Sequence, residues 1–184
     1  MMNLSQWFQK GIPSKEYIQS MKNHQENSKY ILEQFAVPAQ DEEFFSELKK
    51  KDLRVIVITE DWCGDAMVNV PILLRLAEKA NMEVRMILRD QNLELMDQYL
   101  TNGTSRSIPI FIFIDQSGNE YAVWGPRADS VQYFVEEQRS KLPPKDAPQF
   151  EERQKEMYEK MMKKYIEDRS VWNDIYESIK LKLQ

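Results

Sequence analysis

Residues 54–65, Arg-Val-Ile-Val-Ile-Thr-Glu-Asp-Trp-Cys-Gly-Asp, join an apolar run to the only cysteine of the chain. The run at 55–59 is rich in β-branched residues, which is typical of a strand buried on both faces of a sheet. Apolar residues then recur at helical spacing over residues 66–80. Cys63 is therefore expected between the end of a central strand and the start of a helix, where α/β proteins present reactive groups.

Strand and helix patterns alternate around this stretch. Residues 83–88 and 110–114 are predicted strands, and the turn at 116–119 leads into a returning strand at 121–124. Helices are predicted over residues 41–51, 93–102 and 127–142. This alternation predicts an α/β fold.

Helical segments flank the α/β body at both ends. The first is a predicted helix that Ser14 caps and Pro38 ends, with a polar stretch at 23–29 weakening its middle. Residues 150–183 contain neither proline nor glycine, and their apolar residues recur at steps of three and four. We expect three regions: an N-terminal helical extension at 1–40, the α/β domain at 41–142 and a C-terminal helical extension at 143–184.

The C-terminal segment is predicted to form one long amphipathic helix, or two helices joined near Asp168. Its apolar stripe is expected to pack on the chain's own core. The alternative is a surface for a partner or for a homodimer through this helix. A sustained heptad seam is not established, which favours the first interpretation.

Composition excludes several classes of protein. The chain has 184 residues, of which 42% are hydrophobic, and a net charge of -5 with no basic block, so we expect neither nucleic-acid nor membrane binding. One cysteine excludes an internal disulfide, and one histidine argues against a metal site; no cofactor is expected. The first residues lack the pattern of a secretory signal, which predicts a cytoplasmic protein.

The segment Trp62-Cys63-Gly64 after a buried strand resembles the active loop of the thioredoxin superfamily, Trp-Cys-Gly-Pro-Cys. The resemblance extends over roughly residues 41–142. Its other parts are Pro71 inside the following helix, Asp90-Gln91-Asn92 after the second strand, Ile108-Pro109 before an apolar strand, the turn Ser117-Gly118-Asn119-Glu120, and Gly125.

The resemblance implies a three-layer fold with a central mixed sheet of about four strands. It also implies that Pro109 follows a cis peptide bond and faces the cysteine, and that the backbone of Ile108 pairs with an extended bound peptide. Cys63 would then be the catalytic residue. The substrate-binding residues would be Trp62, Gly64, Asp65, Ile108 and Pro109.

Four departures from the family pattern bear on function. Ala66 stands where the family has its second cysteine, so Cys63 has no partner for the intramolecular attack that releases a mixed disulfide. Val57 replaces the buried acid, Met86 the nearby lysine and Asp65 the loop proline. A general protein-disulfide reductase is therefore disfavoured.

The charges around Cys63 act in opposite directions. A helix N-terminus stabilises a thiolate, whereas Glu60, Asp61 and Asp65 would destabilise it by repulsion. Asp65 is equally explained as an acid stabilising the first turn of the helix. We expect the thiol to face solvent, and the sequence leaves the direction of its pKa shift open.

Three functions are consistent with these residues. The leading hypothesis is monothiol exchange, in which Cys63 forms a mixed disulfide with a protein or a low-molecular-weight thiol and an external thiol resolves it. The alternative is a non-catalytic binding module that uses a cleft between Trp62, Ile108 and Pro109. A metal or iron–sulfur role ranks third, since Asp65-Ala66 departs from the loop of cluster-binding relatives and His24 is expected on a solvated helix face.

Overall fold

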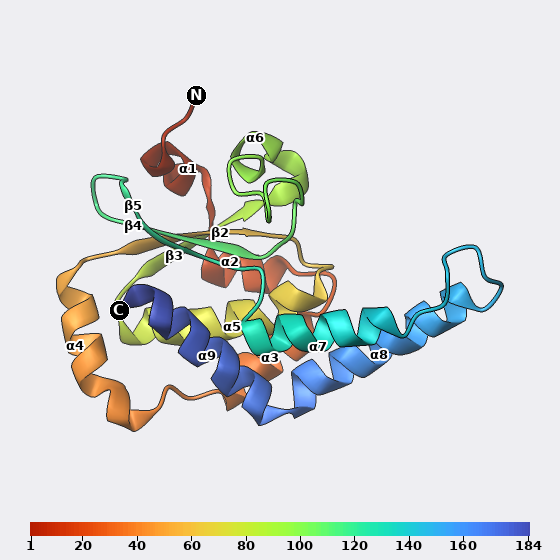
Figure 1. Ribbon diagram of the computed structural model, residues 1–184. Coiled ribbons are helices and arrows are strands. Elements are labelled where there is room, and N and C mark those ends of the chain that lie inside the picture. The colour runs from red at the N-terminus through yellow and green to blue at the C-terminus, as the bar shows by residue number, and fades with distance from the viewer.

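The central sheet has five strands in the order β1-β3-β2-β4-β5 (Figure 1). The computed structural model describes residues 1–184. Strand β2 (Arg54–Thr59) runs parallel to β3 (Glu83–Leu88) and antiparallel to β4 (Ile110–Ile114), which pairs antiparallel with β5 (Glu120–Trp124). The predicted α/β fold with a mixed central sheet is confirmed.

Burial of the two central strands follows from helices on both faces of the sheet. In Figure 1, α1 (Leu4–Lys10) and α6 (Leu93–Met96) lie on one side, while α5 (Gly64–Lys79) and α9 (Arg169–Leu183) lie on the other. Every residue of β4 is buried, as are the last five of β2. Such two-sided burial is why these strands are continuous apolar runs rather than alternating ones.

The fifth strand, β1 (Ile12–Pro13), pairs antiparallel with β3 at the edge of the sheet. A two-residue strand that contains proline carries no alternating pattern, and proline is tolerated only where a strand needs no further backbone donor. Gly11 is required before it, since a Cβ there would lie 2.6 Å from the Cβ of Arg85. The segment 1–40, expected only as a helical extension, thus contributes to the sheet.

Two helices replace the single N-terminal helix that the sequence predicts. They are α2 (Ser14–Ser20) and α3 (Gln25–Gln34), and His24 between them has a left-handed φ of 56°. Ser14 begins α2, but its side chain makes no capping bond. A short 3-10 turn, Ala39–Asp41, then leads into α4 (Glu42–Lys50).

Two further helices agree less closely with the predicted ranges. A 3-10 turn, Arg89–Gln91, precedes α6, which is only four residues long because the chain turns after it and bridges Thr101 to Ser105. Helix α7 spans Asp129–Ser140.

The C-terminal segment forms two helices, α8 (Phe150–Glu167) and α9. They join at Asp168, whose carboxylate caps α9 by accepting the N–H of Ser170 at 2.9 Å. The stripe of α9 is buried against the chain's own core, so the apolar surface that motivated the homodimer alternative is occupied within the chain; its buried residues are Val171, Trp172, Ile175, Tyr176, Ile179 and Leu183.

Helix α8 differs, because it runs alongside α7 and past the start of α5 (Figure 1). None of the helices combines the length and apolar character needed to cross a bilayer.

Candidate functional site

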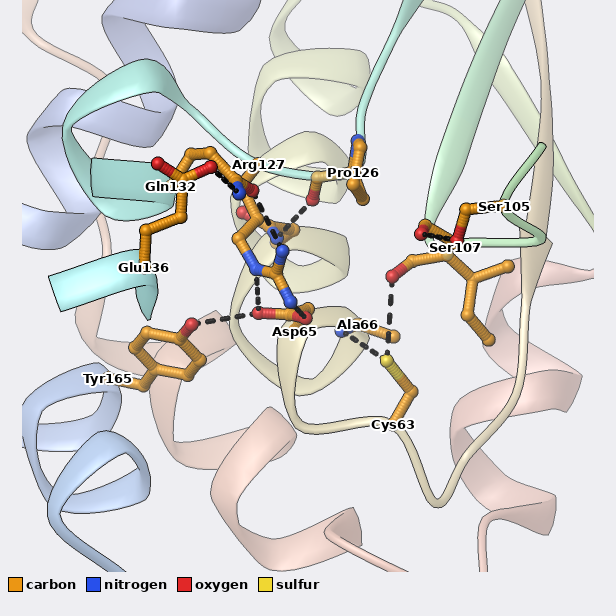
Figure 2. A network of polar contacts seen from close by, with 12 residues as sticks. Cys63, Asp65, Ala66, Ser105, Ser107, Pro126, Arg127, Gln132, Glu136 and Tyr165 are labelled. Carbon is orange, nitrogen blue, oxygen red and sulfur yellow. Dashed lines mark hydrogen bonds and ion pairs between the residues drawn. The ribbon is translucent and has the colours of Figure 1, made fainter. Parts of the chain in front are cut away.

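Cys63 is the N-cap residue of α5, directly after the loop that leaves β2. Its Sγ accepts the backbone N–H of Ala66 at 3.4 Å and donates to the carbonyl oxygen of Ile108 at 3.6 Å (Figure 2). The Ile108–Pro109 peptide bond is cis. The sulfur therefore lies where β2, α5 and the loop before β4 meet.

The Cys63 side chain is only 8% exposed. Burial is the main reason that its pKa rises from an ordinary value of 9.0 to about 11, and the Asp65 carboxylate raises it further. The N–H groups of Ala66 and Asp65 and the Arg127 guanidinium oppose this shift without reversing it. The expectation that the thiol faces solvent is wrong.

Helix α8 packs against the residue that follows Cys63. Met162 lies on Gly64, so closely that a Cβ on Gly64 would be 2.8 Å from Met162 Sδ. Only glycine therefore fits beneath α8 at this position without moving Met162. The predicted role of Gly64 in substrate binding stays a prediction, since its close approach is to Met162 of α8.

Asp65 is the centre of a polar network that joins three helices (Figure 2). Arg127 donates to both carboxylate oxygens, at 2.9 Å from Nε and 2.6 Å from Nη2, and Tyr165 of α8 donates to Oδ1 at 2.8 Å. The Asp65 and Arg127 side chains are 12% and 11% exposed. Burial, then the Asp65 charge, raises the pKa of Tyr165, which keeps the phenol protonated as a donor.

The other two acids near Cys63 are engaged elsewhere. Asp61 accepts the backbone N–H of Lys22 at 2.8 Å and of Asn23 at 3.3 Å. Although burial opposes them, these hydrogen bonds hold the pKa of Asp61 below its usual value. Glu60 accepts the N–H of Asp90 at 2.9 Å. Both carboxylates thus hold neighbouring loops by hydrogen bonds to their backbone N–H groups, an arrangement that the sequence does not reveal.

Of the remaining predicted site residues, Trp62 is exposed, whereas Ile108 and Pro109 are buried. Trp62 is 48% exposed, and its indole ring lies 5.0 Å from the Arg89 guanidinium. Ile108 and Pro109 are buried behind Cys63. Pro109 is backed by Gly125, whose φ of 132° and close contact with the Pro109 carbonyl oxygen both require glycine.

A pocket of about 420 Å³ lies over Cys63. It brings together four of the predicted site residues, Trp62, Cys63, Gly64 and Asp65, but not Ile108 or Pro109. The other lining residues are His24, Arg127, Arg139, Tyr158, Met161 and Met162.

Several of these lining residues were not predicted from the sequence. His24 was expected on a solvated helix face, but it lies in the turn between α2 and α3 and lines the pocket. Arg127 follows Gly125 and Pro126, and no local pattern distinguishes it from a surface arginine. Met161 belongs to the apolar stripe of residues 150–183, which indicates only an apolar face, and Met162 beside it lies outside that stripe. The structure gathers no group of three or more His, Cys, Asp or Glu side chains that could hold a metal ion.

A cysteine at the strand–helix junction, opposite a cis-proline loop on a mixed sheet, defines a protein with the thioredoxin fold. The sequence model of the family described as thioredoxin matches residues 11–140. The chain therefore belongs to the thioredoxin family. The match begins before β1 and ends with α7, so α8 and α9 lie outside it.

Solved structures agree with the fold. A 1.5 Å crystal structure of a protein of unknown function from Pseudomonas aeruginosa is similar with a TM-score of 0.65 and 16% identity, covering 97% of this chain and 98% of that chain. An HIV epitope scaffold has a TM-score of 0.60 and 16% identity, covering 96% and 99%. No curated protein matches the sequence.

Proposed function

We propose that the protein performs monothiol thiol–disulfide exchange through Cys63. The observation that carries this proposal is the position of the sulfur, at the N-terminus of α5 with the Ala66 N–H directed at it and a pocket above it. A backbone N–H and a helix N-terminus both stabilise the thiolate that attacks a disulfide. Ala66 in place of a second cysteine makes the reaction monothiol.

The exchange has two balanced steps. The Cys63 thiolate attacks one sulfur of a disulfide, a new S–S bond forms, and the other half leaves as a thiolate. An external thiolate then attacks the mixed disulfide, which releases Cys63 and leaves the external thiol disulfide-bonded to the first half. A cytoplasmic setting, which we also propose, keeps a pool of reduced thiols for the second step.

The raised pKa sets the rate of this chemistry. With a pKa of about 11, the thiolate fraction at pH 7 is on the order of 1 in 10,000. Exchange in this conformation is therefore slow at neutral pH and rises about tenfold per pH unit until the pKa is reached. Any movement of α8 that hydrates the sulfur would accelerate it.

Mass spectrometry of the intact protein after incubation with an oxidised small thiol tests the proposal. We expect one adduct, removed by reductant and absent from Cys63→Ser. The same protein in urea supplies the matched control, because its Cys63 is then an ordinary exposed thiol. Labelling in urea with no labelling of the folded chain over hours at pH 9 would contradict exchange.

A non-catalytic binding module is the second candidate. It is favoured by the buried, protonated thiol, which donates to Ile108 as a structural group would, and by the exposed indole of Trp62. Affinity capture with wild-type and Cys63→Ser protein separates the two. Partners held equally by both proteins after washing with reductant support binding, and partners lost with Cys63 support exchange.

A further inference from the structure

We propose that the pocket over Cys63 selects small disulfides bearing a carboxylate and excludes disulfides of folded proteins. This inference rests on the proposed exchange reaction and specifies its substrate class. It combines three features of the pocket: the helix that covers it, the unpaired side chains of Arg139 and His24, and its apolar wall.

The covering helix, α8, limits what reaches the sulfur. Met162 covers Gly64, and Tyr165 ties α8 to Asp65 on the first turn of α5. The space left is about 420 Å³, within the range of roughly 300–1,000 Å³ typical of small-molecule sites. An extended strand of a folded protein would have to displace α8, whereas a molecule of peptide-fragment size would not.

The charged groups favour an anion. Arg127 and Asp65 form an ion pair and so neutralise each other. Arg139 of α7 and His24 also line the pocket, and neither side chain makes a hydrogen bond or ion pair within the chain, although His24 lies near enough to Asp61 to act on its charge. In a protein of net charge -5, Arg139 is thus a cation in this pocket with no partner in the chain, and the His24 ring adds an N–H donor. A guanidinium offers two parallel donors to a carboxylate, which makes Arg139 the expected anchor.

The wall of the pocket accepts the uncharged part of the ligand. Met161 and Met162 supply flexible thioether side chains, and Tyr158 and Trp62 supply aromatic ones. The carboxylate would be held at Arg139 while one sulfur meets Cys63. The proton of the Cys63 thiol passes through solvent to the departing thiolate, so the step consumes no further oxidant or reductant.

The test compares three disulfides of different charge: oxidised glutathione (anionic), bis(2-hydroxyethyl) disulfide (neutral) and cystamine (cationic). The rate of Cys63 adduct formation is measured at pH 9 and low salt. Each rate is divided by that of the same disulfide with 2-mercaptoethanol, which removes differences in intrinsic reactivity. We expect the anionic disulfide to exceed the cationic one by about tenfold, and the preference to shrink at high salt.

Variants assign the preference to the pocket. Arg139→Gln is expected to slow the anionic disulfide about threefold and to leave the neutral one unchanged. Lys160→Gln is the matched control, since it removes the same charge from an exposed position on α8 that does not line the pocket. Insulin, a protein disulfide, is expected to form no adduct under conditions in which oxidised glutathione does.

The outcomes separate the inference from the reaction on which it depends. If no disulfide labels folded Cys63, the exchange reaction itself is wrong. If all three label it with equal normalised rates, if Arg139→Gln behaves as Lys160→Gln does, or if insulin reacts as fast as oxidised glutathione, exchange stands and the selectivity is overturned.

Discussion

The two C-terminal helices share one amphipathic pattern but have different roles in the structure. Helix α9 buries six of its 15 residues, including Trp172 and Tyr176, against α5 and β5. Helix α8 buries three of 18 and contacts the site through Met162 and Tyr165. The difference indicates that α9 belongs to the core, whereas α8 is a cover held by few contacts. Changes in α9, at Cys63 and in α8 should therefore lower the free energy of unfolding by decreasing amounts.

Removing the largest anchor of α9 should unfold the protein most readily. Trp172 is 1% exposed and donates to the Tyr165 carbonyl at 2.7 Å. We expect Trp172→Ala to lower the free energy of unfolding by about 4 kcal/mol, from lost burial and a cavity. Urea denaturation measures it. A decrease in the free energy of unfolding of less than about 1 kcal/mol would contradict the assignment of α9 to the core.

Ionising the covered thiol should also destabilise the fold. The pKa of Cys63 is about 11 in the folded chain against 9.0 ordinarily. The folded chain thus favours the protonated form, and this contribution is fully present below pH 9 and lost as the pH rises through 11. We expect about 2–3 kcal/mol between these limits.

Tyrosines ionise over the same pH range as Cys63. Comparison with Cys63→Ser, whose serine does not ionise, isolates the contribution of the thiol to the loss of stability. Urea unfolding of both proteins at pH 8 and pH 11 gives the difference between them. A difference that stays constant with pH would mean that the cover does not exclude water from the sulfur.

Neutralising Asp65 should both weaken the attachment of α8 and lower the pKa of Cys63. Asp65→Asn leaves the buried Arg127 guanidinium with an uncharged amide oxygen in place of a carboxylate, and we expect a loss of about 2 kcal/mol. It also removes the carboxylate that raises the pKa of Cys63, so the pH midpoint of iodoacetamide alkylation should fall. Asp97→Asn, which breaks the exposed pair with Arg106, is the control and should change neither quantity appreciably. An unchanged alkylation midpoint in Asp65→Asn would contradict this account.

Shortening Met162 should have the smallest effect on stability but should clearly increase the access of reagents to Cys63. Met162→Ala trims the residue over Gly64 and should lower the free energy of unfolding by about 1 kcal/mol or less, because Met162 is only partly buried. Alkylation of Cys63 should accelerate at least about threefold. Met157→Ala removes the same side chain from α8 outside the pocket and should leave the rate unchanged. Equal rates in both variants would show that α8 does not control access.

Local patterns predicted the parts of the fold that depend on local burial. Strands β2 and β4 read as apolar runs because both their faces are covered, and Cys63 follows β2 as the junction requires. Strand β1 was missed because two residues carry no periodicity. The predicted helix at 93–102 was too long because spacing does not report where tertiary turns such as that at Thr101 take over.

The candidate site was only partly predictable for a related reason. Cys63 and its neighbours are contiguous, so their motif can be read directly. His24 reaches the pocket from the turn between α2 and α3, Arg127 from the loop between β5 and α7, and Met162 from within α8. Nothing in their local sequence encodes that approach. The direction of the pKa shift also depended on the tertiary structure, because the burial of Cys63 could not be inferred from its local sequence.

Strand β1 has a consequence for the solubility of shortened forms of this chain. Ile12 and Pro13 cover one margin of β3, and Pro13 lacks the N–H that would recruit another strand. Deleting the first 13 residues would uncover hydrogen-bonding groups of β3 and offer them as a template to neighbouring molecules. The short strand thus protects β3 from pairing with strands of other molecules.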